Sequence, residues 1–305
     1  MASSRSSGNP RRRASSGANG QTAERVVIAP ADRRDAVVAA ITTAKRELRM
    51  AIFRCDDFAV LDALASVLKR GVRLRLLLTS RAKGWKKKLG ALLALLENMG
   101  AEVRSYADPV VKYHAKYLVT DNRLAVIASL NFTQKCFGDT CDFLLTTRDP
   151  KVVRGLVRLF DADWESPDAA FPSNLGDRLI VGPEEARDQM TELLASAERS
   201  IRIVDHKLTD PAMLSLLKDR RAAGITVDVK GEAHVAPLRP HGKLVLVDER
   251  VAVIGSVALS ALSLGFRREV AVAIRHPALV RELNTYYHSL TPGAPVPRSP
   301  VKGSP

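Results

Sequence analysis

The sequence is poor in cysteine and has no long apolar run. Its three cysteines, Cys55, Cys136 and Cys141, are an odd number without a CxxC pair, which argues against a disulfide framework and a zinc site. No apolar run approaches the roughly 20 residues that span a bilayer. No apolar stretch follows the arginines near the N-terminus, as a secretory signal would require. These absences predict a soluble globular protein, with the cytoplasm as its expected location.

Negative charge is also in short supply. The 305 residues include 47 Lys or Arg and 33 Asp or Glu, which gives a formal net charge of +14. The two ends contribute +3 and +2, so +9 remains for the chain between them. This excess predicts an anionic partner. Nucleic acid, anionic lipid and a phosphorylated substrate all satisfy it, and the sign of the charge does not choose among them.

Both ends of the chain are predicted to be disordered. Residues 1–24 consist largely of Ser, Gly, Asn and Arg, so they form a basic tail that cannot bury a core. Residues 291–305 are rich in Pro, Gly and Ser. The folded part is therefore expected between these two tails.

An internal repeat occupies that middle part. A shift of 153 positions places Arg25–Pro30 over Arg178–Pro183, and each copy continues with a strand, a leucine-spaced helix and a second strand. A shift of 127 aligns the later segments, so the second copy lacks 26 residues that the first fills with a basic amphipathic helix at 82–100. The repeat predicts a duplicated β-α-β protein with two domains, 25–172 and 173–290.

The second alignment superimposes two copies of one motif. Its members are His114, Lys116 and Asp121 in the first copy and His241, Lys243 and Asp248 in the second. A His and a Lys two positions apart on a strand point to the same face, which brings an imidazole and an ammonium together. One such pair would ordinarily be an unremarkable surface feature. Two pairs in register within a diverged repeat indicate function.

The paired motifs suit attack on a phosphodiester. Lysines neutralise the negative charge that repels nucleophiles, together with the charge that grows in the transition state. A neutral imidazole can attack phosphorus while a protonated one donates to the leaving oxygen. Histidine titrates near neutrality, so two copies of one residue can fill both roles. Because two lysines supply the positive charge, no metal or other cofactor is expected.

The sequence resembles the phospholipase D superfamily, whose signature is HxKxxxxD followed six residues later by a GGxN- or GSxN-like element, usually twice per chain. The resemblance implies α/β architecture with two pseudo-symmetric α/β/α sandwich domains, each a mixed β-sheet flanked by helices. It places the active site at the interface of the halves. It also implies a covalent phosphohistidine intermediate, with His114 as the nucleophile and His241 as the general acid.

The resemblance assigns further roles by position. Both motif triads are the catalytic set, although Asp121 and Asp248 stand at predicted turns that they are expected to brace. The substrate phosphate would contact the two lysines and three further residues: Ser129, Asn131 and Ser256. Asp142 and Glu269 would orient the histidine rings. The second motif has Ala258 where Asn is expected, which removes one phosphate ligand.

Residues outside the motifs bear on the substrate. The basic run with Trp85, Lys86, Lys87 and Lys88 is either a solvated helix start or a substrate selector that contacts the phosphates of nucleic acid or anionic lipid. His206 follows a strand end and is a candidate to line the cleft.

Three functions remain open. We favour hydrolysis or headgroup exchange on phospholipids, with peripheral association with an anionic membrane. The alternatives are a DNA or RNA phosphodiesterase, which the basic composition favours, and a catalytically weakened binding module, for which Ala258 is the argument.

Overall fold

The computed structural model describes residues 24–81, 84–166 and 170–290. Residues 1–23 and 291–305, the predicted disordered tails, lie outside that part. Glu24, which the sequence places in the first tail, instead begins a strand, and its carboxylate binds Arg178 Nη1 at 2.9 Å. Among the described residues no helix is both long and apolar enough to cross a bilayer.

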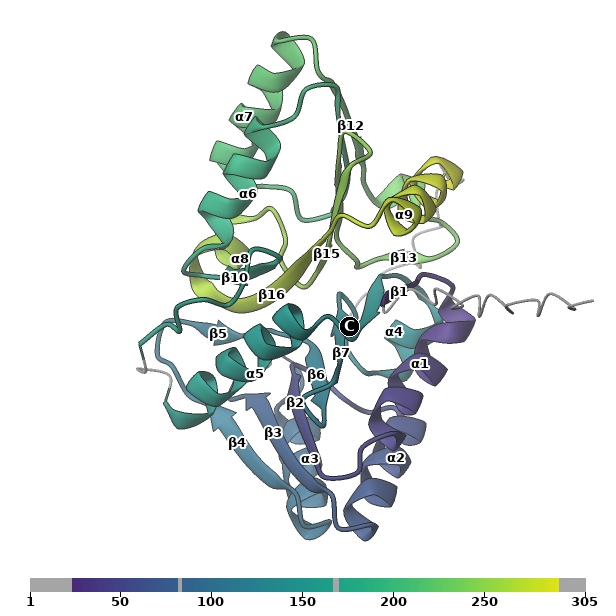
Figure 1. Ribbon diagram of the computed structural model, residues 1–305, viewed down its shortest axis with the longest axis vertical. Coiled ribbons are helices and arrows are strands. Elements are labelled where there is room, and N and C mark those ends of the chain that lie inside the picture. The colour runs from purple at the N-terminus through teal and green to yellow at the C-terminus, as the bar shows by residue number, and fades with distance from the viewer. Residues whose placement is uncertain (1–23, 82–83, 167–169, 291–305) are drawn as a thin grey trace, which may run out of the picture.

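Two mixed sheets organise the chain (Figure 1). The first half contains, in order, β1 (Glu24–Val27), α1 (Pro30–Thr42), β2 (Glu47–Ile52), α2 (Phe58–Lys69), β3 (Arg73–Thr79), α3 (Lys86–Asn98), β4 (Glu102–Tyr106), β5 (Lys112–Tyr113), β6 (Tyr117–Thr120), β7 (Leu124–Ala128), α4 (Gln134–Gly138), β8 (Thr140–Cys141), β9 (Leu144–Thr147) and α5 (Pro150–Glu165). Its sheet has the order β1-β9-β7-β6-β2-β3-β4.

The second half repeats this arrangement. It contains β10 (Leu179–Gly182), α6 (Ala186–Ala195), β11 (Ser200–Val204), α7 (Pro211–Ala222), β12 (Thr226–Lys230), a short 3-10 turn (Glu232–His234), β13 (Arg239–Pro240), β14 (Leu244–Val247), β15 (Val251–Gly255), α8 (Ala261–Phe266), β16 (Arg267–Ile274) and α9 (Pro277–Ser289). The sheet order is β10-β16-β15-β14-β11-β12, which matches the first sheet strand for strand without β4. The predicted fold class, mixed sheets flanked by helices, is confirmed.

The inserted segment holds more than the sequence indicates. The predicted helix at 82–100 is α3, and β4 follows it and pairs in parallel with β3 at the edge of the sheet. The strand was missed because its sequence, EVRSY, is short and mostly polar, as is usual for an edge strand.

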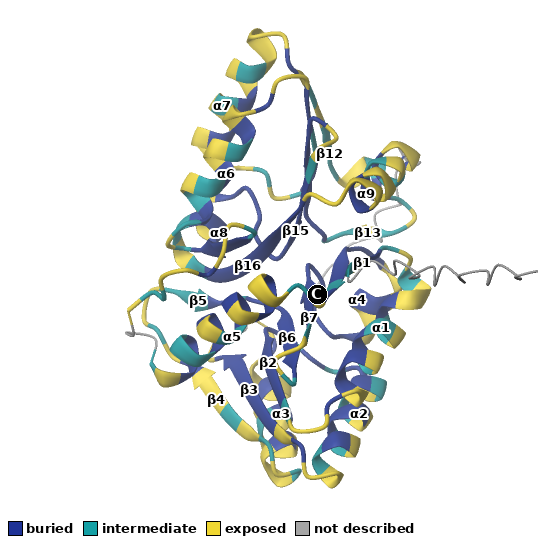
Figure 2. Ribbon diagram, viewed as in Figure 1, coloured by how far each residue is buried: buried dark blue, intermediate teal, exposed yellow. Residues whose placement is uncertain are grey.

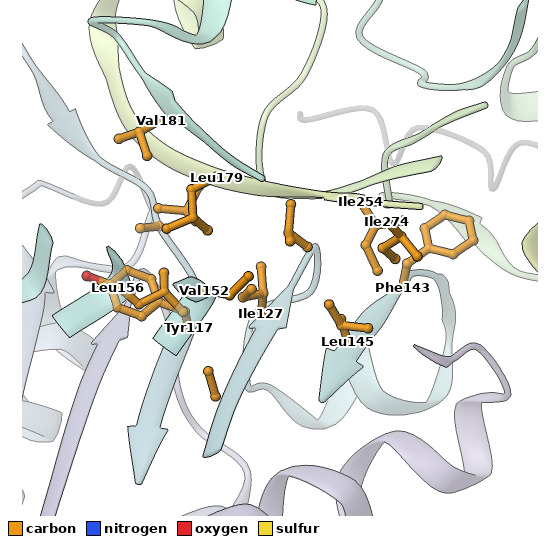
Figure 3. Packing of buried hydrophobic residues seen from close by; sticks show 14 of the residues in the cluster. Tyr117, Ile127, Phe143, Leu145, Val152, Leu156, Leu179, Val181, Ile254 and Ile274 are labelled. Atoms are coloured by element: carbon orange, nitrogen blue, oxygen red, sulfur yellow. The ribbon is translucent and has the colours of Figure 1, made fainter. Parts of the chain in front are cut away.

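A shared apolar core joins the two halves. Side chains alternate between the two faces of a strand, so Tyr117 and Ile127 face the second half while Leu118 and Val126 face the helices of the first. Figure 3 shows the inward side chains meeting those of β10, β15 and β16, with α5 contributing Val152 and Leu156. In Figure 2 the central strands are buried, whereas the edge strand β4 and the outer surfaces of the helices are exposed. We propose that the domain boundary lies near 172–173, between α5 and β10.

Arg33 in α1 holds the backbone around β8 in place. The side chain is fully buried, and its guanidinium donates to the carbonyl oxygens of Thr140 (2.6 Å), Asp142 (2.9 Å) and Ile28 (2.6 Å). Thr140 begins β8 and Asp142 directly follows it, so Arg33 fixes the backbone that carries Asp142.

We expect Arg33→Met to lower the free energy of unfolding by about 3 kcal/mol, since three buried carbonyls lose a charged donor. Urea denaturation measures the change. Arg73→Met is the matched control, because the Arg73–Glu102 pair is exposed and should matter little. Equal effects of the two substitutions would contradict the role of Arg33.

Candidate active site

Two short strand pairs hold the halves together at the predicted site. β5 pairs in parallel with the start of β16, and β13 pairs in parallel with β8. The registers are Lys112↔Arg267, Tyr113↔Arg268, Arg239↔Thr140 and Pro240↔Cys141. Each residue of the first pair lies 127 positions from its counterpart in the second, with the halves exchanged. The contact is thus a local two-fold arrangement within one chain.

Each predicted catalytic histidine follows one of these strands and meets an acid from the opposite half. His114 Nδ1 lies 2.5 Å from Glu269 Oε1, and its backbone N–H donates to Arg268 O at 2.9 Å. His241 Nδ1 lies 2.9 and 3.0 Å from the two carboxylate oxygens of Asp142. Both acids are fully buried. Because Nδ1 is engaged in both rings, Nε2 is the atom left for a substrate.

The two lysines lie beside their histidines, as the spacing predicts, but each His–Lys pair lies in the connection between two strands and not on a strand. Lys116 Nζ donates to His114 O at 2.6 Å and lies 3.2 Å from His114 Nδ1. Lys243 Nζ donates to His241 O in the same way. Both side chains are buried. Lys243 contributes to the lowered pKa of His114 and Lys116 to that of His241, so each ring lies within the field of the other half's ammonium.

The two histidine–acid pairs differ electrostatically. Burial lowers the pKa of His114 far below its usual value, and Lys116 and Arg267 lower it further. Burial also lowers the pKa of His241, but there Asp142 opposes the shift. Burial raises the pKa of Glu269, whereas the His241 ring and two hydroxyl donors overcome burial and lower that of Asp142. His114 is therefore the ring kept neutral, and His241 is the ring whose partner supports a proton.

The predicted phosphate-binding serines bind other groups of the protein. Ser129 Oγ donates to Asp142 Oδ1 at 2.6 Å and accepts from the Phe143 N–H. Ser256 Oγ accepts from the Val270 N–H and donates to its carbonyl oxygen. Both hydroxyls are buried and engaged. Their hydrogen bonds connect the segment after β7 to Phe143 and the segment after β15 to β16, next to the acids, and phosphate binding by these two hydroxyls stays a prediction.

Asp121 and Asp248 do not reach the histidines. They begin the β6–β7 and β14–β15 turns with positive φ angles of 51° and 53°. Asp121 accepts from the N–H groups of Lys45, Arg46 and Glu47, and Asp248 accepts from those of residues 198–200. Their inclusion in the catalytic set is corrected to a bracing role at the ends of the strands remote from the histidines.

A cavity of about 690 Å³ opens beside His241, and we call it the His241 cavity. Asn131 lines it with a buried side-chain oxygen that has no hydrogen-bond partner, and His206 lies there as predicted. Burial lowers the pKa of His206 to about 4. Four cationic side chains also line it: Lys88 of the predicted selector, and Arg54, Lys135 and Arg239, which the sequence analysis missed. Arg239 was detectable, because the repeat places a basic residue, Lys112 or Arg239, two positions before each histidine.

The basic run at the start of α3 divides between two cavities. Trp85 is buried, with Arg54 and Lys88 over its ring at 5.8 and 5.7 Å, so it forms a wall of the His241 cavity. Lys88 pairs with Asp56 at 3.2 Å. Lys86 lines a second cavity, and Lys87 is exposed. Of the predicted selector, Trp85 and Lys88 thus line the His241 cavity and Lys86 lines the second cavity.

One group among the described residues has the composition and spacing of a metal site. Ligand atoms of Cys136, Asp142 and His241 lie within 4.8 Å of one another. Both Asp142 oxygens are already engaged, by Ser129, Thr140 and His241. A cation would therefore have to displace the ring from its acid.

Comparison with known proteins agrees with this geometry. Residues 37–164 match the family described as "Cardiolipin synthase, PLD-like domain". Residues 37–164 thus resemble a phospholipase D-like domain. Mitochondrial cardiolipin hydrolase from Danio rerio is 28% identical over 135 residues, which cover 44% of this chain and 57% of that protein. The chain therefore spans little more than half the length of this relative.

Two solved structures share the fold across both halves. Polyphosphate kinase from Porphyromonas gingivalis has a TM-score of 0.72 at 18% identity, covering 87% of this chain and 46% of that one. Phosphatidylserine synthase from Haemophilus influenzae has a TM-score of 0.66 at 11% identity, covering 88% and 86%. The family match ends within α5, and the second half is related to the matched segment by the internal repeat and by the crosswise contacts.

We expect Gly242→Ala to destabilise the junction by about 2 kcal/mol, since added volume at a close contact forces strands apart. A Cβ there would lie 2.5 Å from Cys141 O and 2.8 Å from the Asp142 Cα. Gly231→Ala is the control, because its Cβ meets nothing within 4 Å. Urea unfolding of both variants measures the difference. A Gly242 variant as stable as the control would mean that β13 and β8 are not held this closely.

Proposed function

We propose that this protein is a metal-independent phosphodiesterase that hydrolyses phospholipids or exchanges their headgroups through a phosphohistidine intermediate. The observation that carries the proposal is the crosswise pair of histidines, each with its Nδ1 against a buried acid of the other half. The family match supports the reaction class. The matched family and the relative from Danio rerio are both named for cardiolipin, which supports a lipid substrate.

The two histidines take different roles. His114, kept neutral by burial and neighbouring cations, attacks phosphorus through Nε2, so a P–N bond forms as the P–O bond to the leaving alcohol breaks. His241, whose carboxylate partner supports a proton, gives that proton to the departing oxygen. Water or an acceptor alcohol then attacks phosphorus, so a P–O bond forms as the P–N bond to His114 breaks. The attacking oxygen gives its proton to His241. Attack by water completes hydrolysis, and attack by an alcohol completes headgroup exchange.

Positive charge around the phosphate comes from the chain itself. Lys116 and Lys243 would turn from the histidine carbonyls to phosphate oxygens, and Asn131 would donate its amide N–H from the wall of the His241 cavity. These groups stabilise the charge that grows on the non-bridging oxygens. Because the second motif has Ala258 in place of Asn, Asn131 in the His241 cavity is the one motif amide in this group of proposed phosphate ligands.

A nuclease is the second candidate function. Its support is the His241 cavity, where Arg54, Lys135 and Arg239 could track the backbone of a polyanion. The cavity also contains Asp56 and Glu232, which a phosphate chain would have to avoid.

We expect the protein to cleave phosphatidylglycerol in EDTA and to leave single-stranded DNA intact. His114→Ala should remove all but a few per cent of turnover without loss of folding, because no intermediate can form. His288→Ala, which changes an exposed histidine on α9, is the control. Product release measured by mass spectrometry tests this. DNA cleavage without lipid turnover would replace lipid by nucleic acid as substrate. Cleavage of neither, with binding retained, would favour the binding module.

We expect Asp142→Asn to change the pH dependence as well as the rate. The Asp142 carboxylate holds the pKa of His241 above the value that burial alone would give. Without it that pKa falls, less of the ring is protonated at neutral pH, and the alkaline limb of kcat/KM moves to lower pH. The loss at neutral pH should be about 100-fold. Asp32→Asn, in an exposed pair with Arg25, is the control. A lower kcat with an unmoved profile would argue against proton donation by His241.

A further inference from the structure

A second cavity, of about 840 Å³, lies on the other side of the start of α3. Gly84, Lys86 and Leu89 face it, whereas Trp85 and Lys88 face the His241 cavity. We call it the basic-apolar cavity. Both halves contribute to it, because Val110 and Lys112 lie in the first and Leu262, Phe266 and Arg267 in the second.

Exposed apolar side chains gather at this cavity. Val110, Leu262 and Phe266 are 62%, 59% and 49% exposed, and they are three of the six large apolar residues that are exposed in the described part of the chain. Segments more than 150 positions apart supply them. Single exposed apolar residues need no explanation, but a group at one cavity marks an interaction surface.

The charged residues of the cavity have one sign. Arg81, Lys86, Lys112 and Arg267 line it, and no acidic residue does among those that the structure describes. Burial and the neighbouring Arg267, Arg54 and Arg81 lower the pKa of Lys112, which indicates uncompensated positive charge. Arg81 also donates to the carbonyl oxygens of Asp108 and Pro109, so it holds the loop that presents Val110. The partner must therefore be apolar and anionic together.

The cavity adjoins the proposed nucleophile. Lys112 Nζ lies 5.0 Å from the Phe53 ring centroid, and that ring lies 4.5 Å from the ring of His114. Arg267 Nη1 lies 3.7 Å from Glu269 Oε1, the oxygen that faces His114 Nδ1. A lipid seated here would thus lie next to Lys112 and Arg267, which are connected to His114 through Phe53 and Glu269.

We propose that the basic-apolar cavity docks the protein on an anionic phospholipid bilayer, with Val110, Leu262 and Phe266 inserting among acyl chains and the four cations binding lipid phosphates. This docking site rests on the proposed lipid activity and gives it a route to the substrate. The combination of apolar and uniformly cationic residues favours a bilayer over a nucleic acid, whose phosphates would gain nothing from Val110 and Leu262.

The test compares matched charge insertions in the full chain. Leu262→Asp/Phe266→Asp changes the cavity, and Leu214→Asp changes an exposed leucine on α7, which lies at the far end of the second half (Figure 1). Lys86→Glu is matched by Lys218→Glu, also on α7. Flotation with phosphatidylcholine vesicles, with and without phosphatidylglycerol, measures binding. Thermal unfolding verifies that each variant folds.

We expect wild type to bind only the vesicles with phosphatidylglycerol. The double variant and Lys86→Glu should each bind at least about 10-fold more weakly, since they lose apolar burial or a phosphate contact, and the α7 controls should match wild type. Unchanged binding by folded cavity variants would overturn the docking site. A fall in single-stranded DNA binding in its place would overturn it in favour of nucleic acid.

Hydrolysis of the soluble diester bis(4-nitrophenyl) phosphate separates this proposal from the proposed chemistry. Cavity variants should hydrolyse it as wild type does while losing activity on vesicles. A wild type that cleaves the soluble diester but binds no vesicles would overturn docking and leave the chemistry intact. Vesicle binding that depends on the cavity, without diester hydrolysis, would support docking and count against the chemistry.

Discussion

Each half of the molecule depends on the other for the carboxylate that holds its histidine. Glu269 comes from β16 and faces His114, while Asp142 follows β8 and faces His241. The parallel pairs β5–β16 and β13–β8 set these distances, and the apolar core of Figure 3 holds the sheets that carry them. A duplicated fold thereby produces one site, because neither copy contains a complete histidine–acid pair.

Burial makes this arrangement electrostatically asymmetric. Two ammonium groups, two imidazoles and two acids are removed from water, so their mutual fields are strong and small differences between the copies have large effects. Glu269 is one methylene longer than Asp142, and its second oxygen accepts from Ser263, whereas Asp142 takes hydroxyl donors from Ser129 and Thr140. The pKa of Asp142 is lowered and that of Glu269 is raised, so the two copies differ in the direction of the shift.

The sequence predicts the parts of the site that the repeat preserves. His114, Lys116 and their counterparts are visible because they stay in register where most other positions diverge. The same alignment predicts the duplicated β-α-β units, and the family resemblance implies the mixed sheets. The crosswise pairing could not be read from the chain, since nothing local indicates which acid meets which ring. The hydrogen bonds of the two serines could not be read from the chain either, because Ser129 binds the Asp142 carboxylate whereas Ser256 binds the backbone of Val270. Val110, Leu262 and Phe266 share no spacing in the sequence, and only folding brings them to one cavity.

A crystal structure with orthovanadate would test the central claim most directly. The account predicts vanadium bonded to His114 Nε2, with His241 Nε2 facing the opposite apical oxygen, Lys116 and Lys243 on the equatorial oxygens, and Glu269 and Asp142 still against the Nδ1 atoms. An anion bound by one half alone, or histidine rings paired with the acids of their own halves, would contradict it.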